Sequence, residues 1–275
     1  MRAWDLNGFE RSLRSNEKSE NTISKYLRDV KCFMEFSEYE EISMENLIRW
    51  KQSLLSAGYK PRSINSMIAA VNSYLTYTGH QDCILKSIRI QKHSYRQVSE
   101  ELTRDEYFRL VGASAERPKL QLIMQTICST GIRVSELGSF TVEAVRAGEV
   151  VISCKGKFRI IIIPALLRKL LLDYSEHNHI ETGVIFLSKS GKPIDRVAIW
   201  QGMKSICNRA GVDPGKVYPH NLRKLFAREF YAADRDISKL ADVLGHSSIE
   251  TTRIYIMGTG EEHRALIDKL GLVLQ

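Results

Sequence analysis

The chain of 275 residues has few of the residues that build disulfide frameworks or metal sites. Its cysteines number only five, are scattered and form no CxxC pair, so neither a disulfide framework nor a zinc site is expected. A reducing cytoplasm fits this pattern best. The glycines form neither GxGxxG nor a P-loop, so nucleotide binding has no support in the sequence. We therefore expect no cofactor and no metal.

Long apolar runs are also missing. The most apolar segment, residues 160–167, contains Pro164 and is far shorter than the roughly 20 residues that a membrane-spanning helix needs. The N-terminus alternates charged and apolar residues and lacks the continuous apolar stretch of a signal peptide. The sequence therefore predicts a soluble intracellular protein with no membrane partner. Residues 160–163 are expected to form a buried strand.

Acidic residues are fewer than basic ones, 32 against 40, which gives a formal net charge of +8 and an isoelectric point near 9.2. Such a balance favours a polyanionic partner such as nucleic acid, although many basic proteins bind no DNA. At 31.4 kDa the chain is long enough for two domains, each with its own hydrophobic core.

Apolar residues in the first third of the chain recur with the spacing of one helix face. They form two full sets and a shorter set between them: Ile23, Tyr26, Leu27, Val30 and Met34; Leu47, Trp50, Leu54 and Leu55; Ile64, Met67, Ile68, Val71 and Leu75. The middle helix should stop at Gly58, and a shorter helix is expected around Phe9 and Leu13. Residues 1–85 are therefore predicted to form a small helical domain. Residues 86–100 are basic, have little apolar periodicity and are predicted to be a linker.

A second domain, residues 101–275, is expected to be mainly helical. Thr103 and Glu106 have the spacing of a capping box ahead of an apolar helix. Residues 149–163 are the exception, because β-branched residues flank a short Lys-Gly-Lys turn, as in a β-hairpin. The predicted fold class is mainly α with a small β-hairpin, in two domains.

The segment LGHSSIETTRIY near the C-terminus places a histidine and a tyrosine around a predicted helix start. Gly245 is expected to end one helix, and Ser247 and Glu250 to cap the next. His246 then lies just before a helix N-terminus, where backbone N–H groups and the helix dipole favour an anion. Tyr255 follows about two turns further along.

Two pairs of residues three positions apart add arginines to this set. His220 and Arg223 share one face of a predicted helix, and Glu136 can orient the guanidinium of Arg133. Two guanidinium groups can hold the non-bridging oxygens of a phosphodiester, and an imidazole can take the proton of a phenol nucleophile. The set therefore suits phosphoryl transfer without a metal, with a lysine at the hairpin tip to protonate the leaving oxygen.

The boxes that contain these residues, TGIRVSEL, HNLR and LGHSSIETTRIY, resemble the signature of the tyrosine recombinases, also called the phage integrase family. The resemblance spans residues from about 103 to 257, and the N-terminal helices are similar to the SAM-like core-binding domain of the family. It implies a two-domain, C-shaped clamp with a mixed α/β catalytic domain. It also implies a role for each residue: Arg133 and Arg223 as the phosphate clamp, Glu136 as the support of Arg133, His220 as the general base, His246 as a hydrogen-bond donor to the phosphate, and Tyr255 as the nucleophile.

The resemblance further implies a catalytic lysine in the hairpin, followed closely by glycine. Lys155 fits this pattern. Lys157 is the alternative, because this turn is one residue shorter than is usual in the family. Lys224 stands where many members have a second histidine, a departure that alters electrostatics more than mechanism.

The reaction implied by the resemblance is DNA strand exchange. Tyr255 attacks a scissile phosphate, forms a 3′-phosphotyrosyl link and frees a 5′ hydroxyl. A 5′ hydroxyl from a second duplex reverses the step, without ATP or metal. Four protomers on two double-stranded DNA sites with short inverted core sequences would pass through a Holliday junction.

The tail, residues 265–274, is apolar enough to dock in a neighbouring protomer, as in the family. Because the predicted core-binding helices begin almost at once, we expect no extra N-terminal arm-binding domain, and this expectation favours an Xer-like or small mobile-element recombinase. Dimer resolution and element integration both stay open, and so does a second recombinase or an accessory protein as a partner.

Simpler or different interpretations stay open at this point. Five basic residues can track DNA phosphates or can merely form a solvated surface: Lys60, Arg62, Arg89, Lys92 and Arg96. His177 and His179 have a spacing that can suit a metal, but no cysteine or carboxylate frame accompanies them, so loop residues are the simpler interpretation.

Other functions also compete. A type IB topoisomerase uses similar residues to relax DNA without strand exchange, but the boxes are recombinase-like. A non-catalytic DNA-binding protein of the same fold should have lost at least one active-site residue, whereas this chain has them all. A helix-turn-helix regulator built on residues 236–250 would not explain the TGIRVSEL and HNLR boxes.

Overall fold

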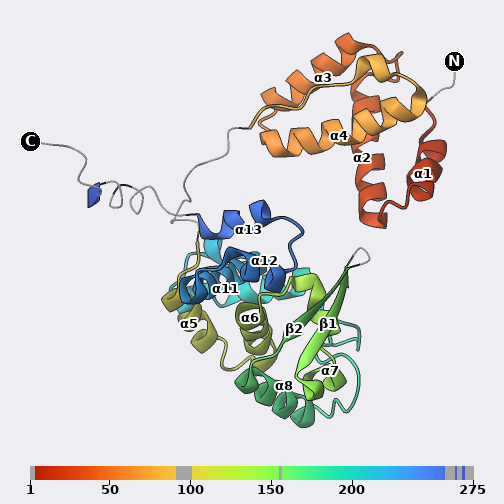
Figure 1. Ribbon diagram of the computed structural model, residues 1–275. Coiled ribbons are helices and arrows are strands. Elements are labelled where there is room, and N and C mark those ends of the chain that lie inside the picture. Colours follow the sequence, from red (N-terminus) through yellow and green to blue (C-terminus); the bar gives the residue numbers. More distant parts are fainter. Residues whose placement is uncertain (1–3, 91–100, 155–156, 258–263, 265–267, 270–275) are drawn as a thin grey trace, which may run out of the picture. The chain divides into compact units, whose positions relative to one another are not determined.

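The computed structural model describes residues 4–90, 101–154, 157–257, 264 and 268–269. Two compact units make up the chain, Met1–Lys92 and His93–Gln275, and each has a hydrophobic core of its own (Figure 1). None of the helices in the described ranges has the length and apolar content that a membrane crossing requires.

The described part of the first unit contains α1 (Leu6–Ser15), α2 (Glu20–Phe36), α3 (Met44–Ser56), α4 (Pro61–Thr78) and a 3-10 turn, η1 (Gln81–Cys83). Side-chain oxygens of Asp5, Ser19 and Ser43 accept backbone N–H groups at the starts of α1, α2 and α3. Pro61 opens α4, where its missing N–H costs nothing. The helices predicted from the apolar periodicity are confirmed.

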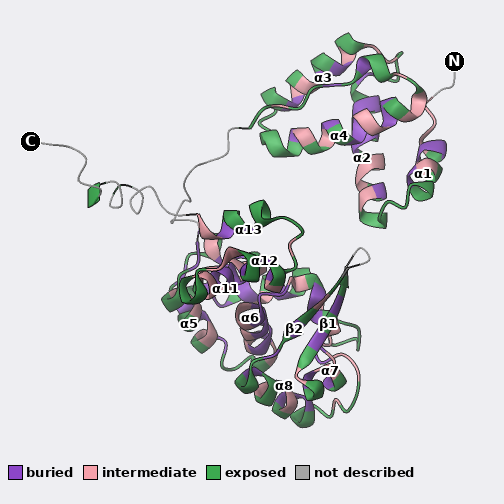
Figure 2. Ribbon diagram, in the orientation of Figure 1, coloured by how far each residue is buried: buried purple, intermediate pink, exposed green. Residues whose placement is uncertain are grey.

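Aromatic rings fill the core of this unit. Trp50 and Phe33 pack edge to face with ring centroids 5.3 Å apart, and Phe9 and Tyr74 do the same at 5.2 Å. The buried residues lie on the inner faces of the helices, as the amphipathic spacing requires (Figure 2).

Residues 81–90 are held along α4 by two asparagines. The Asn72 side chain donates to the carbonyl oxygen of Leu85 at 2.9 Å and accepts the Leu85 N–H at 3.0 Å. Asn65 binds Ile88 in the same way, at 2.9 and 2.7 Å. Residues 86–90 of the predicted linker therefore lie against the first unit. The rest of that linker lies outside the described residues, and the predicted domain boundaries stay predictions.

The described part of the second unit is mainly helical with one two-stranded sheet, so the predicted fold class is confirmed. Its elements are α5 (Arg104–Ala113), α6 (Pro118–Thr130), η3 (Val134–Ser139), α7 (Val142–Ala147), β1 (Glu149–Cys154), β2 (Lys157–Ile162), α8 (Ala165–His177), α9 (Arg196–Ser205), α10 (Cys207–Ala210), η4 (Pro214–Lys216), α11 (Pro219–Asp234), α12 (Ile237–Leu244) and α13 (Ile249–Ile256). The side chains of Thr103 and Glu106 each accept the backbone N–H of the other, which confirms the predicted capping box.

Helix α6 runs through the core of the second unit, in contact with α8 and α11 (Figure 1). It ends at Gly131, whose φ of +64° is left-handed. A Cβ at this position would lie 2.3 Å from the ring of Phe226 on α11, so only glycine fits. The chain therefore turns sharply beside α11, and Arg133 follows two residues later.

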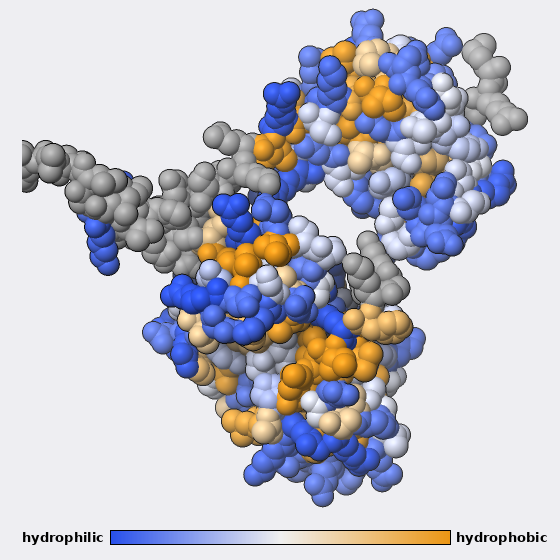
Figure 3. All heavy atoms as spheres, in the orientation of Figure 1, coloured by the Kyte–Doolittle hydropathy of each residue, from blue (hydrophilic) through white to orange (hydrophobic). Residues whose placement is uncertain are grey.

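The hairpin pairs β1 and β2 in antiparallel register. Ile161 and Ile163 are buried, but Ile160 and Ile162 are exposed. The prediction that residues 160–163 form a buried strand is therefore wrong for alternate residues, because only one face of this sheet is covered. The open face contributes to an apolar patch on the surface of the second unit (Figure 3).

Candidate active site

Arg133 lies in the loop between α6 and η3, and Glu136 holds it at two points. The carboxylate accepts the backbone N–H of Arg133 at 2.7 Å and its guanidinium Nη1 at 3.0 Å. Glu136 itself is buried, whereas the Arg133 side chain is 41% exposed. The ion pair expected between them is present, and part of the guanidinium side chain remains open to solvent.

Arg223 on α11 is almost fully buried, with only 2% of its surface exposed. Its Nη1 donates to the carbonyl oxygen of Gly131, and its Nη2 donates to that of Leu244 at 2.8 Å. Both oxygens lie at helix C-terminal ends, where the helix dipole favours a cation. Burial, reinforced by the charge of Arg133, lowers the pKa of Arg223 to about 10, so the side chain stays charged at neutral pH.

His246 lies in the turn between α12 and α13. Its Nε2 is 3.0 Å from Nη2 of Arg223, and its Nδ1 is 2.9 Å from the hydroxyl oxygen of the buried Thr252. A guanidinium can only donate, so Nε2 is the acceptor and Nδ1 of the neutral ring carries the proton. Burial first, and then the charges of nearby arginines, lower the pKa of His246 to about 4. The predicted role as a donor to a phosphate therefore requires Nε2 to leave Arg223 and gain a proton.

Tyr255 on α13 is buried and packs near two imidazole rings. Its ring stacks on His246 with centroids 5.5 Å apart and an interplanar angle of 16°, and its centroid is 5.6 Å from that of His220. The tyrosine also belongs to a small apolar cluster with residues of α11 and α12. Residues from the boxes HNLR and LGHSSIETTRIY thus meet at one place.

The turn before α13 differs in one detail from the expectation. Gly245 ends α12 with a φ of +64°, as predicted. The N-cap of α13 is Ser248, whose side chain makes no capping hydrogen bond, so the prediction that Ser247 caps this helix is wrong. Glu250 lies in the first turn, where its charge suits the helix dipole, and is 3.7 Å from Arg253. The helix starts one residue later than a Ser247 cap would place it.

His220 lies in the first turn of α11, three residues before Arg223 as predicted. Partial burial, followed by the charges of Lys224 and Arg223, lowers the pKa of His220 below the usual value. The lowered pKa favours the neutral ring, which is the form that a general base requires.

Arg159 on β2 belongs to the same cluster, although no motif singled it out. Its Nη2 donates to the Glu136 carboxylate at 2.5 Å, and its Nη1 donates to the carbonyl oxygen of Val243 at 3.2 Å. The alternation of the strand could have identified Arg159 as a buried-face residue, because it shares the inward face of β2 with Ile161 and the adjoining Ile163. A charged side chain on a face that is otherwise buried needs partners.

The remaining predicted site residues are not part of this cluster as described. Lys155 and most of the tail 265–274 lie outside the described residues, while the backbone of Lys157 opens β2 opposite Cys154. Five basic residues were predicted to track DNA. Three of them are exposed in the first unit: Lys60, Arg62 and Arg89. The other two, Lys92 and Arg96, lie outside the described residues.

The histidine pair considered for a metal lies away from the cluster. His177 ends α8, and His179 follows with a left-handed φ of +56°. Within the part of the chain that the structure describes, no three His, Cys, Asp or Glu side chains gather as a metal site would require.

Comparison with known proteins agrees with this geometry. Residues 100–261 match the phage integrase family, and residues 6–82 match the N-terminal SAM-like domain of phage integrases. The fold and the cluster of two arginines, two histidines and a tyrosine define a tyrosine recombinase, an enzyme that breaks and rejoins DNA. The chain belongs to the phage integrase family, and within it the chain is Xer-like.

Its relatives cover nearly the whole chain. Tyrosine recombinase XerA of Thermococcus kodakarensis is 28% identical over 274 residues, which cover 96% of this chain and 94% of the relative. The crystal structure of XerH site-specific recombinase bound to difH substrate has a TM-score of 0.71 at 19% identity and covers 97% of this chain and 85% of that one. A lambda integrase tetramer bound to a Holliday junction also has a TM-score of 0.71 at 19% identity, covering 91% and 76%. These two structures show a shared fold.

Proposed function

We propose that this chain is a site-specific recombinase in which Tyr255 cuts DNA through a 3′-phosphotyrosyl intermediate. The observation that carries the proposal is the chain of contacts from Arg223 through His246 to the ring of Tyr255. It brings together a buried cation from the HNLR box and an imidazole and a phenol from the LGHSSIETTRIY box. A phosphate bound beside them meets a nucleophile and a charge-stabilising group at once.

The two arginines are the proposed phosphate clamp. Arg133 offers a partly exposed guanidinium, and Arg223 is anchored at two helix ends. Guanidinium groups placed where negative charge develops stabilise the transition state of phosphoryl transfer, the task that a metal ion performs in many other enzymes. The proposed reaction therefore uses no metal.

The proposed path of the proton is based on the protonation states of the His220 and His246 rings. His220 takes the phenolic proton while Oη of Tyr255 bonds to the phosphorus and the bond from phosphorus to the 5′ oxygen breaks. Lys155 gives a proton to the departing 5′ oxygen, with Lys157 as the alternative donor, and His246 donates to the phosphate once its Nε2 is protonated. The phosphotyrosyl bond conserves the energy of the phosphodiester, so a 5′ hydroxyl can reverse the step without ATP.

The proposed partner is double-stranded DNA with short inverted core sites. Related structures hold XerH on a difH substrate and a lambda integrase tetramer on a Holliday junction. We assign the same kind of assembly to this chain: four protomers that exchange strands between two sites, with the tail 265–274 docked in a neighbouring protomer. A second recombinase or an accessory protein is compatible with this assembly.

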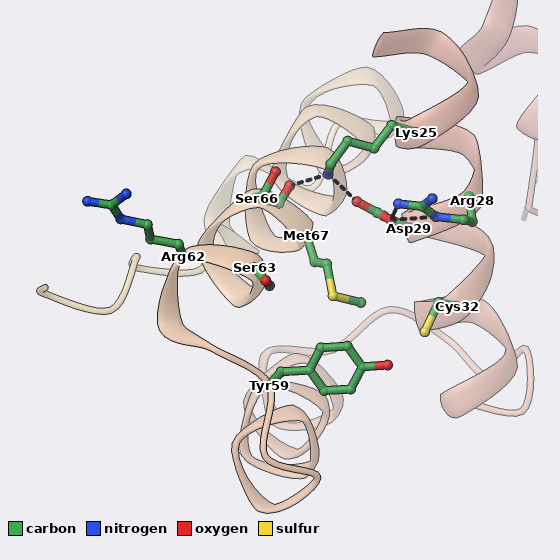
Figure 4. Close-up of a pocket in the computed structure, with 9 residues that line it drawn as sticks. All are labelled: Lys25, Arg28, Asp29, Cys32, Tyr59, Arg62, Ser63, Ser66 and Met67. Carbon is green, nitrogen blue, oxygen red and sulfur yellow. Dashed lines mark hydrogen bonds and ion pairs between the residues drawn. The ribbon is translucent and has the colours of Figure 1, made fainter. Parts of the chain in front are cut away.

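The first unit offers a basic pocket for DNA contact. A hollow of about 630 Å³ lies between α2 and α4 (Figure 4), and these residues line it: Lys25, Arg28, Asp29, Cys32, Tyr59, Arg62, Ser63, Ser66 and Met67. Asp29 pairs with Lys25 and, at 3.0 Å, with Arg28, whose side chain is 73% exposed. Exposed cations at the rim of a hollow suit phosphate oxygens. This hollow, with Arg62 in its lining, and the exposed Lys60 and Arg89 are the proposed DNA contacts of the first unit.

The proposal is tested by covalent trapping. Wild type and Tyr255→Phe are each mixed with nicked duplexes tiled from the DNA that flanks the gene, with a chelator present, and resolved on a denaturing gel. We expect a protein–DNA band of reduced mobility from wild type alone, because only Tyr255 supplies the nucleophilic oxygen. Both proteins should bind the same duplex in a native gel.

Three results would overturn the proposal. A covalent band of equal strength from Tyr255→Phe would assign the nucleophile elsewhere. Tight binding to one duplex without any covalent band from wild type would indicate a regulatory DNA-binding protein instead. Relaxation of supercoiled plasmid without recombinant products would indicate a topoisomerase-like activity.

A further inference from the structure

Arg159 is a largely buried cation of the site, and the proposed reaction assigns it no role. Only 12% of its side chain is exposed, and its two terminal nitrogens reach different elements. Nη2 donates to Glu136 in η3, and Nη1 donates to the carbonyl oxygen of Val243 in the last turn of α12. Both terminal nitrogens of Arg159 thus contact protein groups, and these contacts join η3 to α12.

The contact of Arg159 with Glu136 affects the position of Arg133. Oε1 of Glu136 accepts Nη1 of Arg133, while Oε2 accepts both the backbone N–H of Arg133 and Nη2 of Arg159. Without Arg159, the carboxylate would face Arg133 alone, and a bidentate pair would draw that guanidinium away from a phosphate. With Arg159 in place, two cations share one carboxylate, so a net positive charge remains for a ligand.

The contact of Arg159 with the carbonyl oxygen of Val243 affects the position of His246. Arg159 binds the carbonyl oxygen of Val243, and Arg223 binds the next one, that of Leu244, at 2.8 Å. Two guanidinium groups therefore fix consecutive carbonyl groups immediately before the turn that carries His246. The same Nη2 of Arg223 contacts Nε2 of His246, so the position of the turn decides whether this contact forms.

Gly245 packs directly on the Arg159 side chain. A Cβ at Gly245 would lie 2.5 Å from Cδ and 2.7 Å from Nη1 of Arg159. The left-handed φ of +64° already favours glycine here, and the arginine adds a second, independent reason. A larger residue at this position would have to displace Arg159.

We propose that Arg159 is a positioning residue, which holds Arg133 through Glu136 and holds the His246 turn through Val243. The inference rests on the proposed function for the reaction that this arrangement serves. One side chain thereby ties the phosphate clamp to the imidazole beside the nucleophile, and its loss disturbs both.

The second unit contains a matched arginine outside the site. Arg168 on α8 donates from Nε to the carbonyl oxygen of Val145 at 3.0 Å and from Nη2 to that of Arg146, at the end of α7. That helix also ends at a left-handed glycine, Gly148, with a φ of +85°. Arg168→Ala therefore removes the same kind of contact without touching the site, and serves as the control.

The first experiment needs no DNA. In the full-length protein with ¹⁵N-labelled histidines, the chemical shifts of Nδ1 and Nε2 report the tautomer of each ring, and His246→Asn identifies the signals of His246. We expect wild-type His246 to be protonated on Nδ1 at neutral pH, and to become a mixture of tautomers in Arg159→Ala. Arg168→Ala should keep the wild-type signals.

The second experiment measures binding and single-turnover cleavage separately, on the duplex that wild type cleaves best. Arg159→Ala should slow cleavage by about 10²-fold, the scale of an ångström-sized misplacement, while binding stays unchanged. Arg159→Lys should recover part of the rate, because an ammonium group can meet one of the two partners. Free guanidinium ion should accelerate Arg159→Ala more than sodium at equal ionic strength does.

The outcomes separate this inference from the proposed function. An unchanged His246 tautomer and unchanged cleavage in Arg159→Ala would overturn the inference, and so would equal losses in Arg168→Ala. Absence of cleavage by wild type on every duplex would refute the proposed function, while the histidine spectra would still decide the positioning role. If Arg159→Ala melts below the assay temperature, Arg159→Lys and Gly245→Ala are measured in the same two ways, and wild-type behaviour of both would overturn the inference.

Discussion

Each unit of this protein buries one carboxylate between two cations, but the two clusters are built differently. In the first unit, Asp29 meets Lys25 and Arg28, and all three residues lie on α2. In the second unit, Glu136 meets Arg133 from its own turn and Arg159 from β2. The charged residues of the first cluster therefore come from one helix, although Lys25 also donates to the carbonyl oxygen of Ser66 on α4, whereas those of the second come from separate elements.

The cations also differ in exposure. Arg28 is largely exposed and Lys25 is partly exposed, so their attraction to Asp29 is screened and contributes little stability. Arg223 is buried and Arg159 is largely buried, so their charges depend mainly on protein groups for compensation. The comparison teaches that the first cluster shapes a basic surface, while the second holds a reactive site in one arrangement.

The largest effect is expected from Arg223→Ala. This substitution removes the donor to the carbonyl groups of Gly131 and Leu244 and takes away positive charge from the site. We expect cleavage to slow by about 10² to 10³-fold, the usual scale for the loss of one transition-state donor. The free energy of unfolding should fall as well. Single-turnover cleavage and urea unfolding measure the two effects.

The matched change in the first unit is Arg28→Ala. Because this side chain is largely exposed, the free energy of unfolding should change by at most about 1 kcal/mol. Binding to DNA should weaken and depend less steeply on salt, because one phosphate contact is lost. A cleavage rate on bound DNA that falls as far as in Arg223→Ala would break the comparison.

A smaller effect on cleavage is expected from Glu136→Gln. The neutral amide leaves Arg133 and Arg159 without their shared anion. Cleavage should slow by about 10- to 100-fold, the scale seen when a partner that orients a binding side chain is lost. The free energy of unfolding should fall by about 3 kcal/mol, because a charge on the buried Arg159 stays uncompensated.

Asp29→Asn is the corresponding change in the first unit. Its cations can turn to solvent, so the loss of unfolding free energy should be about 1 kcal/mol and cleavage of bound DNA should match wild type. Equal stability losses in Asp29→Asn and Glu136→Gln would show that the exposure of the cations does not set the energy of these clusters.

The same contrast shows how far the sequence can predict this protein. Short spacings along the sequence were sufficient to predict the Arg133–Glu136 ion pair and the turn at Gly245, because both depend on neighbours along the chain. The meeting of the three boxes followed from the family resemblance rather than from spacing. The role of Arg159 could not be predicted in this way, since its partners are 23 and 84 residues distant.

The two wrong predictions have local causes. A run of isoleucines such as residues 160–163 indicates a strand but does not say which of its faces is covered. Ser247 and Ser248 are chemically equivalent as N-caps, and only the backbone conformation at Ser248 decides where α13 begins.

An acid sensitivity is also expected, and it arises in the second unit. His246 has a pKa of about 4 in the folded chain, against about 6.5 for an ordinary histidine. Between these values the unfolded chain binds a proton that the folded ring does not, so the free energy of unfolding should fall as the pH falls from about 6.5 toward 4. Urea unfolding at pH 7 and pH 5 should therefore show a larger loss in wild type than in His246→Asn. An equal loss in both proteins would mean that His246 is not held neutral against Arg223, and the arrangement that Arg159 is proposed to maintain would lose its support.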